Sequence, residues 1–143
     1  DQIKAADNDL RNAVASLSGA ALDWRPLGEE TSSLYILAVH TIGVQRSYIA
    51  RVVGRTVERD RAEEFRSHGE DITPIMAQLD QAEKDIEAWL DEITPEMLEA
   101  RHTIGPQEFS GTGLLAYTVR HVSEHVGHAG MTRQLWDHHA ASA

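Results

Sequence analysis

The spacing of apolar residues along the chain predicts four long amphipathic helices. Near residues 2–18, Ile3, Leu10, Val14 and Leu17 recur at intervals that place them on one face of a helix. The same periodicity returns near residues 32–53, 73–92 and 112–137. The strict alternation that marks a half-buried strand is nearly absent. The pattern therefore predicts an all-α fold, an antiparallel four-helix bundle, in one domain that spans residues 1–143.

Residues that favour helix starts precede three of these segments. One of the three hydroxyl residues at 31–33 is expected to cap the second helix. Thr73 is expected to cap the third, with Pro74 at the first helical position, where its missing N–H has no consequence. Ser110 or Thr112 is expected to start the last helix.

The longer connections are polar. Residues 55–71 mix positive and negative charges and are expected to form a helix tail followed by a surface loop. Residues 101–113 are the least helical stretch, and the Gly105-Pro106 turn within them leaves a short hairpin open as an alternative.

The charge balance excludes a nucleic-acid-binding protein. The chain has 23 acidic and 13 basic side chains and a formal charge of −10, whereas binding to phosphates needs clustered Lys and Arg. Five arginines lie near one another in sequence, but acidic residues dilute them, and they are expected to form a solvated helix end. These arginines are Arg46, Arg51, Arg55, Arg59 and Arg61.

The absence of cysteine removes several kinds of chemistry. A chain of 143 residues with no cysteine has no disulfide, no thiolate metal ligand and no cysteine nucleophile. No apolar run approaches the roughly 20 residues that a membrane span needs. The first residues, Asp-Gln-Ile-Lys, do not resemble a signal peptide. These features predict a cytoplasmic protein with no membrane contact.

Three of the eight histidines are expected to meet in space. His121 and His125 are four residues apart, so they share a helix face, with Cβ atoms about 5–6 Å apart. Imidazoles at that spacing can converge on one divalent cation, although chance placement on a helix surface is the alternative. His128 lies roughly 10 Å along the axis from His121, too far for both to bind one ion easily. His40, on the apolar stripe of the second helix, is therefore the expected third ligand, unless it is a hydrogen-bonded core histidine.

The other four histidines lie in polar sequence and are expected to be solvated; they are His68, His102, His138 and His139. Three imidazoles and no charged ligand suit Zn²⁺, Ni²⁺ or another borderline metal. Three protein ligands, rather than four, leave a position for water or substrate, which is the pattern of a catalytic site.

Three sequence motifs together resemble a known family. They are Trp24-Arg25-Pro26 in the first loop, the run from Ser33 to His40, and His121-x-x-x-His125-x-Gly127 on the last helix. In order and spacing they are similar to the DinB/YfiT-like superfamily of metal-dependent enzymes, and the resemblance covers essentially the whole chain. It implies one divalent metal ion per chain, zinc or nickel, bound by residues at the positions of His40, His121 and His125. That family often has Gln where this chain has His128.

The same resemblance implies a chemistry and an assembly. Characterised relatives are transferases and isomerases that use a small thiol such as mycothiol, bacillithiol or glutathione, and a homodimer is expected. Metal-dependent hydrolysis is the rival reaction, with Glu124 as the candidate base unless it is a solvated surface residue. His128 is the other candidate catalytic residue, with no particular step assigned to it. A metal-binding, dimeric bundle without catalysis is the third alternative. Trp24 is a candidate for the pocket wall, although a loop tryptophan more often covers a core.

Overall fold

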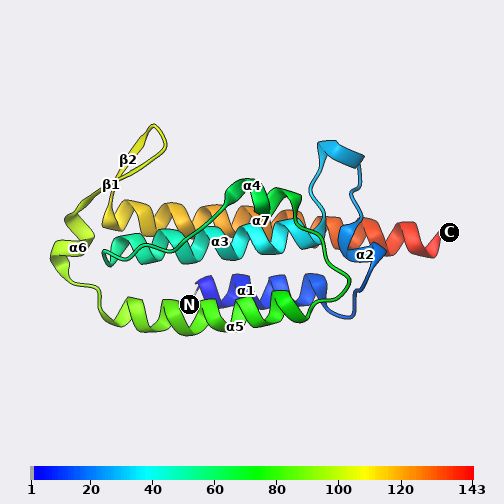
Figure 1. Ribbon diagram of the computed structural model, residues 1–143, viewed down its shortest axis with the longest axis horizontal. Helices are drawn as coiled ribbons and strands as arrows, with labels where there is room; N and C mark the ends of the chain where they lie inside the picture. Colours follow the sequence, from blue (N-terminus) through cyan, green and yellow to red (C-terminus); the bar gives the residue numbers. More distant parts are fainter. Residues whose placement is uncertain (1) are drawn as a thin grey trace.

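Long helices run along the long axis of the molecule, as Figure 1 shows. The computed structural model describes residues 2–143; Asp1, which the predicted domain includes, lies outside the described residues. Within residues 2–143 the long helices are α1 (Gln2–Val14), α3 (Leu34–Val52), α5 (Thr73–Asp91) and α7 (Gly111–Ala141). Helix α3 contacts the other three, and α7 also packs against α1. The prediction of a mainly helical protein is therefore confirmed.

The connections contain shorter elements. They are helices α2 (Ala20–Asp23), α4 (Arg61–Arg66) and α6 (Pro95–Glu99), the 3-10 helix η1 (Gly28–Glu30), and strands β1 (Arg101–Ile104) and β2 (Gln107–Ser110). The strands pair antiparallel, with Arg101 opposite Ser110 and Ile104 opposite Gln107. The hairpin that the sequence left open therefore forms. Gly105 turns the chain between the strands with a φ of 56°, which L side chains rarely adopt.

Most of the expected caps are in place. The Ser33 side chain accepts a hydrogen bond from the backbone N–H of Ile36, and the Ser110 side chain accepts one from Gly113. Thr73 does not cap α5, because it is the first helical residue and follows the N-cap residue Ile72. Helix α5 therefore begins at Thr73, within the predicted range, but Pro74 is its second residue rather than its first.

Two helix ends differ from the predicted ones. Helix α1 ends at Val14 rather than near residue 18, because Ser16 has a φ of 62° and this left-handed conformation ends a right-handed helix. Helix α7 continues to Ala141, four residues past the predicted end. None of the helices in residues 2–143 has both the length and the apolar character needed to cross a membrane.

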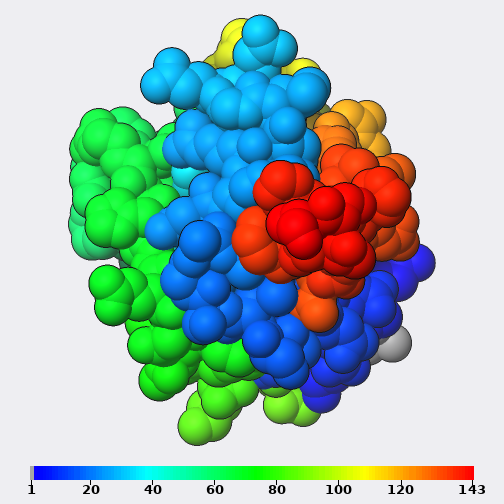
Figure 2. Space-filling model, turned by 90° about the vertical axis from the view of Figure 1, so that its right-hand side faces the viewer, coloured from blue at the N-terminus to red at the C-terminus, as the bar shows by residue number. Residues whose placement is uncertain are grey.

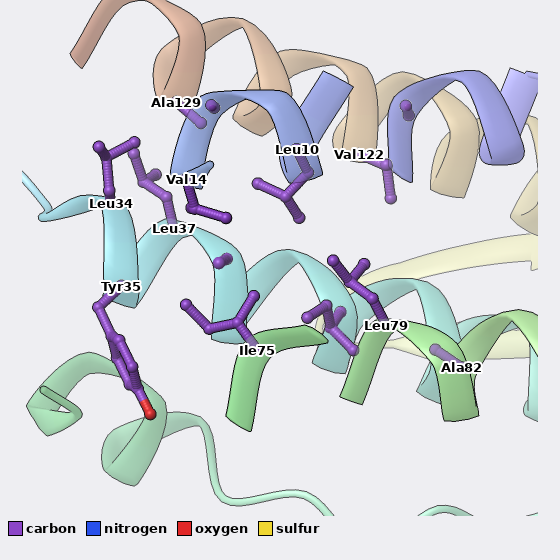
Figure 3. Close-up of a cluster of buried hydrophobic side chains, with 14 of the residues drawn as sticks. Leu10, Val14, Leu34, Tyr35, Leu37, Ile75, Leu79, Ala82, Val122 and Ala129 are labelled. Atoms are coloured by element: carbon purple, nitrogen blue, oxygen red, sulfur yellow. The ribbon is translucent and has the colours of Figure 1, made fainter. Parts of the chain in front are cut away.

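The hydrophobic core lies around α3. Figure 3 shows Leu34 and Leu37 of α3 in one cluster with Leu10 of α1, Leu79 of α5 and Val122 of α7. Each fully buried leucine contributes on the order of 2 kcal/mol through the removal of apolar surface from water. Because neighbours cover α3 on several sides, a polar residue on it, such as His40, is buried as well. The core therefore fixes the position of the candidate site.

Candidate metal centre

Two helices bring three of the predicted residues together. His40 comes from α3, and His121 and His125 come from α7, one turn apart. One ring nitrogen of each can be chosen so that all three lie within 4.8 Å of one another. The two Nε2 atoms of His121 and His125 are 3.0 Å apart. The structure therefore forms the candidate three-histidine cluster.

A buried carboxylate orients His40. The Nδ1 atom of His40 lies 2.9 Å from Oε2 of Glu64, a residue of α4. Arg59 in turn donates to both oxygens of Glu64, at 2.6 Å and 2.7 Å. When Nδ1 carries the proton and donates it to Glu64, Nε2 is the ring nitrogen left with a lone pair for a metal. A carboxylate behind a ligating histidine is a common arrangement in metal sites.

The charge state of Glu64 follows from these contacts. Burial by itself would raise the pKa of Glu64, but the hydrogen bond from His40 and the Arg59 guanidinium outweigh burial and hold the pKa below its ordinary value. The carboxylate therefore stays ionised and acts as an acceptor toward His40.

The two histidines of α7 are held neutral. Burial, reinforced by the neighbouring His121 and His40, lowers the pKa of His125 to about 4. Burial and the neighbouring His40 also lower the pKa of His121. Neutral imidazole is the form that binds a metal, so these histidines need not lose a proton near pH 7 before a metal binds.

The donor set fits a divalent transition ion. Two nitrogens bound to one tetrahedral zinc at about 2.0–2.1 Å lie roughly 3.3 Å apart. The 3.0 Å separation between His121 and His125 is close to that value. Three imidazoles, of which His40 has a carboxylate behind it, provide the ligand type that zinc and nickel accept. The residues present therefore fit the expected metal.

The two weaker candidates lie outside the cluster. Glu124 is exposed on α7, and His128 is exposed one turn beyond His125, with ring centroids 5.8 Å apart. The group of three potential ligands includes neither of them. His128 instead lines a cavity beside the histidine cluster.

This cavity has a volume of about 630 Å³. His125 and His128 line one part of it, and Trp24 forms another part of the wall. The Trp24 ring also stacks on His139, with centroids 5.3 Å apart, and meets Trp136 edge-on. Figure 2 shows the segment that carries Trp24 (residues 20–33, blue) beside the C-terminal end of α7 (red). Trp24 therefore both lines the cavity and joins two parts of the fold.

Arg59 and Glu64 are the site residues that the sequence analysis missed. Residues 55–71, which include both, were predicted to form a solvated helix end followed by a surface loop. In the structure Glu64 is buried and Arg59 is half-buried. A signal was present: Asp60 is followed three residues later by Glu63, an arrangement that is typical of helix starts. The Asp60 side chain indeed accepts a hydrogen bond from the Glu63 N–H and caps α4.

One histidine expected to be solvated is not. His102 lies half-buried on β1 opposite Phe109, and its Nε2 is buried without a hydrogen-bond partner among the described residues. The strand pair that the sequence left open as an alternative places His102 opposite Phe109 and accounts for the difference. His68, His138 and His139 are exposed, as predicted.

Comparisons with known proteins agree with the fold and the motifs. The family model of the DinB superfamily matches residues 2–129. The chain therefore belongs to the DinB superfamily, and the resemblance seen in its motifs is confirmed. A conserved protein from Enterococcus faecalis, known from its crystal structure, is similar with a TM-score of 0.74 and 16% identity, over 94% of this chain and 92% of that one. At that identity the likeness shows the fold alone. No curated protein matches the chain.

Proposed function

We propose that this protein is a metal-dependent enzyme in which His40, His121 and His125 bind one divalent transition ion per chain, Zn²⁺ or Ni²⁺. The observation that carries the proposal is the convergence of three imidazole nitrogens within 4.8 Å beside a cavity of about 630 Å³. Three protein ligands, rather than four, are typical of catalytic sites, in which water or substrate takes the remaining position.

The residues of the chain prepare this site. Arg59 holds Glu64, and Glu64 accepts the Nδ1 proton of His40, which leaves Nε2 for the metal. His125, with a pKa of about 4, is neutral at physiological pH. When bound, a divalent metal lowers the pKa of a water or thiol ligand and stabilises its anion.

We propose that the reaction is a transfer or isomerisation that uses a small thiol such as mycothiol, bacillithiol or glutathione. The chain has no cysteine, so a sulfur nucleophile has to arrive with a cosubstrate. Thiolate is a soft ligand well suited to zinc. Hydrolysis receives less support, because Glu124, its candidate base, is exposed and lies outside the cluster. His128, on the cavity wall, is better placed to contact a substrate.

We further propose that residues 1–143 form one domain, an antiparallel four-helix bundle, and that the protein is a cytoplasmic homodimer without nucleic-acid or membrane partners. The contacts of α3 with α1, α5 and α7 support the bundle. The charge of −10 and the lack of cysteine support the location and the absence of nucleic acid. Light scattering that gives the 15.9 kDa monomer mass at all concentrations would contradict the dimer.

Metal analysis tests the centre. Protein purified without an affinity tag is expected to contain close to one zinc or nickel ion per chain. His125→Ala should lose most of the metal, because two imidazoles do not replace three at comparable affinity. His68→Ala is the matched control, since His68 is an exposed histidine outside the cluster. Equal metal content in both variants would contradict the proposed ligands.

Cobalt substitution tests the thiol. Cobalt-loaded protein is titrated with mycothiol, bacillithiol, glutathione and coenzyme A, and absorption is followed. A sulfur-to-cobalt charge-transfer band with one of the thiols is the expected result. No band with any thiol, together with metal-dependent ester or phosphoester cleavage that is lost in His121→Ala, would assign the protein as a hydrolase instead.

A further inference from the structure

The strongly exposed apolar side chains of this molecule gather in one place. Within residues 2–143, the large hydrophobic side chains that stay exposed are Leu27, Met131 and Leu135, with exposed fractions of 68%, 58% and 43%. All three line the cavity that also contains His125 and His128. Three such residues from two distant segments, residues 20–33 and helix α7, mark a binding surface rather than scattered surface positions.

The described residues that line this cavity carry negative charge and include no lysine or arginine. Glu30 is the acidic residue among them. Arginines on α3 and α7 are engaged outside this cavity: Arg46 pairs with Asp85, Arg133 pairs with Asp137, and Arg120 lies over Tyr117. In the metal-free protein an acidic ligand would therefore meet a carboxylate at the cavity rim and a protein of charge −10.

The walls of the cavity are built in advance. Trp24 packs against both His139 and Trp136, which also contact each other, so the ring does not need to be ordered when a ligand arrives. Thr31, Ser32 and Thr132 add hydroxyl groups to an otherwise apolar lining. A volume of about 630 Å³ lies within the range of small-molecule sites.

We infer that this cavity binds the apolar, uncharged or cationic part of a small-molecule substrate, such as an aryl or branched alkyl group, and disfavours an acidic group on that part of the substrate, away from the metal centre. The inference rests on the proposed function only in placing the bound group beside the metal centre. It assigns the cavity to the electrophilic substrate rather than to an acidic thiol.

Methionine-methyl NMR on the full chain tests this directly. Met131 lines the cavity, whereas Met76 on α5 and Met97 on α6 do not, so the three methyl signals give one reporter and two internal references. Metal-free protein is titrated at low ionic strength with naphthalene-methanol, naphthalene-methylammonium and naphthoate, so that no metal ion can bind the carboxylate. The first two are expected to shift Met131 selectively, with naphthoate binding at least about threefold more weakly than the ammonium compound.

A matched pair of variants tests the charge. Glu30→Lys should reverse the order of the two charged probes, whereas Glu29→Lys should not, because Glu29 is also exposed but does not line the cavity. Equal binding of all probes, or equal effects of the two variants, would overturn the inference. So would a Met131 signal that shifts with protein concentration alone, because a second copy would then cover the cavity. If the protein binds no metal but still binds the probes, the proposed function is wrong and this inference is still supported.

Discussion

The side chain of Glu64 influences the whole candidate metal centre through its contact with His40. It is buried, and both of its oxygens accept hydrogen bonds from Arg59. One of these oxygens also accepts a hydrogen bond from His40, a proposed metal ligand. An ionised carboxylate in that position fixes the ring orientation of the histidine and raises its basicity. We therefore expect the metal affinity of the proposed site to depend on a residue that does not bind the metal.

Removing this carboxylate is expected to weaken metal binding. Glu64→Ala should lower the zinc affinity about 10- to 100-fold, measured by competition with a chelator. Nitrogen-15 NMR of the metal-free protein should show the Nδ1-protonated form of His40 in the wild type and a mixture of tautomers in the variant. Glu63→Ala, an exposed neighbour on the same helix α4, is the control. An unchanged tautomer and affinity in Glu64→Ala would refute the positioning role.

A second buried carboxylate lies away from the centre, between α1 and α3. Asp7 is fully buried and accepts a 2.9 Å hydrogen bond from Gln45. Its Oδ2 and the Oε1 of Gln45 have no hydrogen-bond partner among the described residues. Burial, and to a smaller extent the nearby Glu83, raises the pKa of Asp7 to about 6, although the Gln45 hydrogen bond lowers it.

The sign of the resulting pH dependence follows from linkage. Between pH 6 and about 4 the folded chain binds a proton at Asp7 while the unfolded chain does not, so Asp7 makes the protein more stable as the pH falls through this window. Above pH 6 the ionised, buried carboxylate destabilises the fold. Asp7→Asn should therefore raise the free energy of unfolding at pH 7 by about 1–3 kcal/mol, and the gain should shrink toward pH 4.

Urea unfolding of metal-free protein at pH 7, 5.5 and 4 measures this effect. Asp9→Asn is the matched control, because Asp9 is an exposed residue two positions along the same helix α1. A gain of equal size at all three pH values would show that Asp7 is not the titrating group.

At the scale of elements, the centre depends on how closely α4 approaches α3. A Cβ atom placed on Gly43 of α3 would lie 2.3 Å from Oε1 of Glu64 and 3.0 Å from Nε of Arg59. Glycine at this position therefore makes room for the carboxylate that orients His40. Helix α4 packs against α3, although α4 is a helix of six residues with no long apolar face.

Gly43→Ala is expected to displace Glu64 and loosen α4. Replacing glycine by alanine inside a helix normally stabilises by up to about 1 kcal/mol. Here the methyl group should instead disrupt the Glu64 hydrogen bonds, with a net loss of about 1–2 kcal/mol and weaker zinc binding. Gly130→Ala on α7 is the control, because nothing lies within 4 Å of its added Cβ. Chemical unfolding and zinc competition compare the two; a gain in stability with unchanged zinc affinity in Gly43→Ala would refute the steric argument.

At the scale of the whole molecule, the centre ties together elements that are far apart in sequence. His40 lies on α3, His121 and His125 on α7, and Glu64 on α4. An ion bound by the folded chain alone therefore stabilises the packing of α3 against α7. The expected stabilisation grows with the concentration of free metal, by about 2.7 kcal/mol at 100 times the dissociation constant.

Zinc is accordingly expected to raise the midpoint of thermal unfolding. For a chain of this size the shift should be on the order of 10 °C at 100 times the dissociation constant. Differential scanning calorimetry with increasing zinc measures it, and His125→Ala should remove most of the shift. A midpoint that zinc does not move in the wild type, or moves equally in the variant, would exclude a site at these residues.

The sequence by itself determined the long helices and the three histidines of the cluster. Helical periodicity is a local property, because residues three and four positions apart share a face whatever the rest of the chain does. The same rule paired His121 with His125, and the apolar surroundings of His40 marked it as buried. The helices and the His121–His125 pair follow from the spacing of residues within one helix. The burial of His40 follows from the packing of apolar helix faces against one another.

Only the tertiary structure decided which polar residues complete the centre and what surrounds it. Glu64 meets His40 across 24 residues of sequence, on a short helix whose charged composition resembles that of a solvated loop. The cavity is likewise formed by two segments that are about 100 residues apart, near Trp24 and near Met131. Burial of a charged residue depends on the partner that neutralises it, and chain packing alone determines which partner lies close enough.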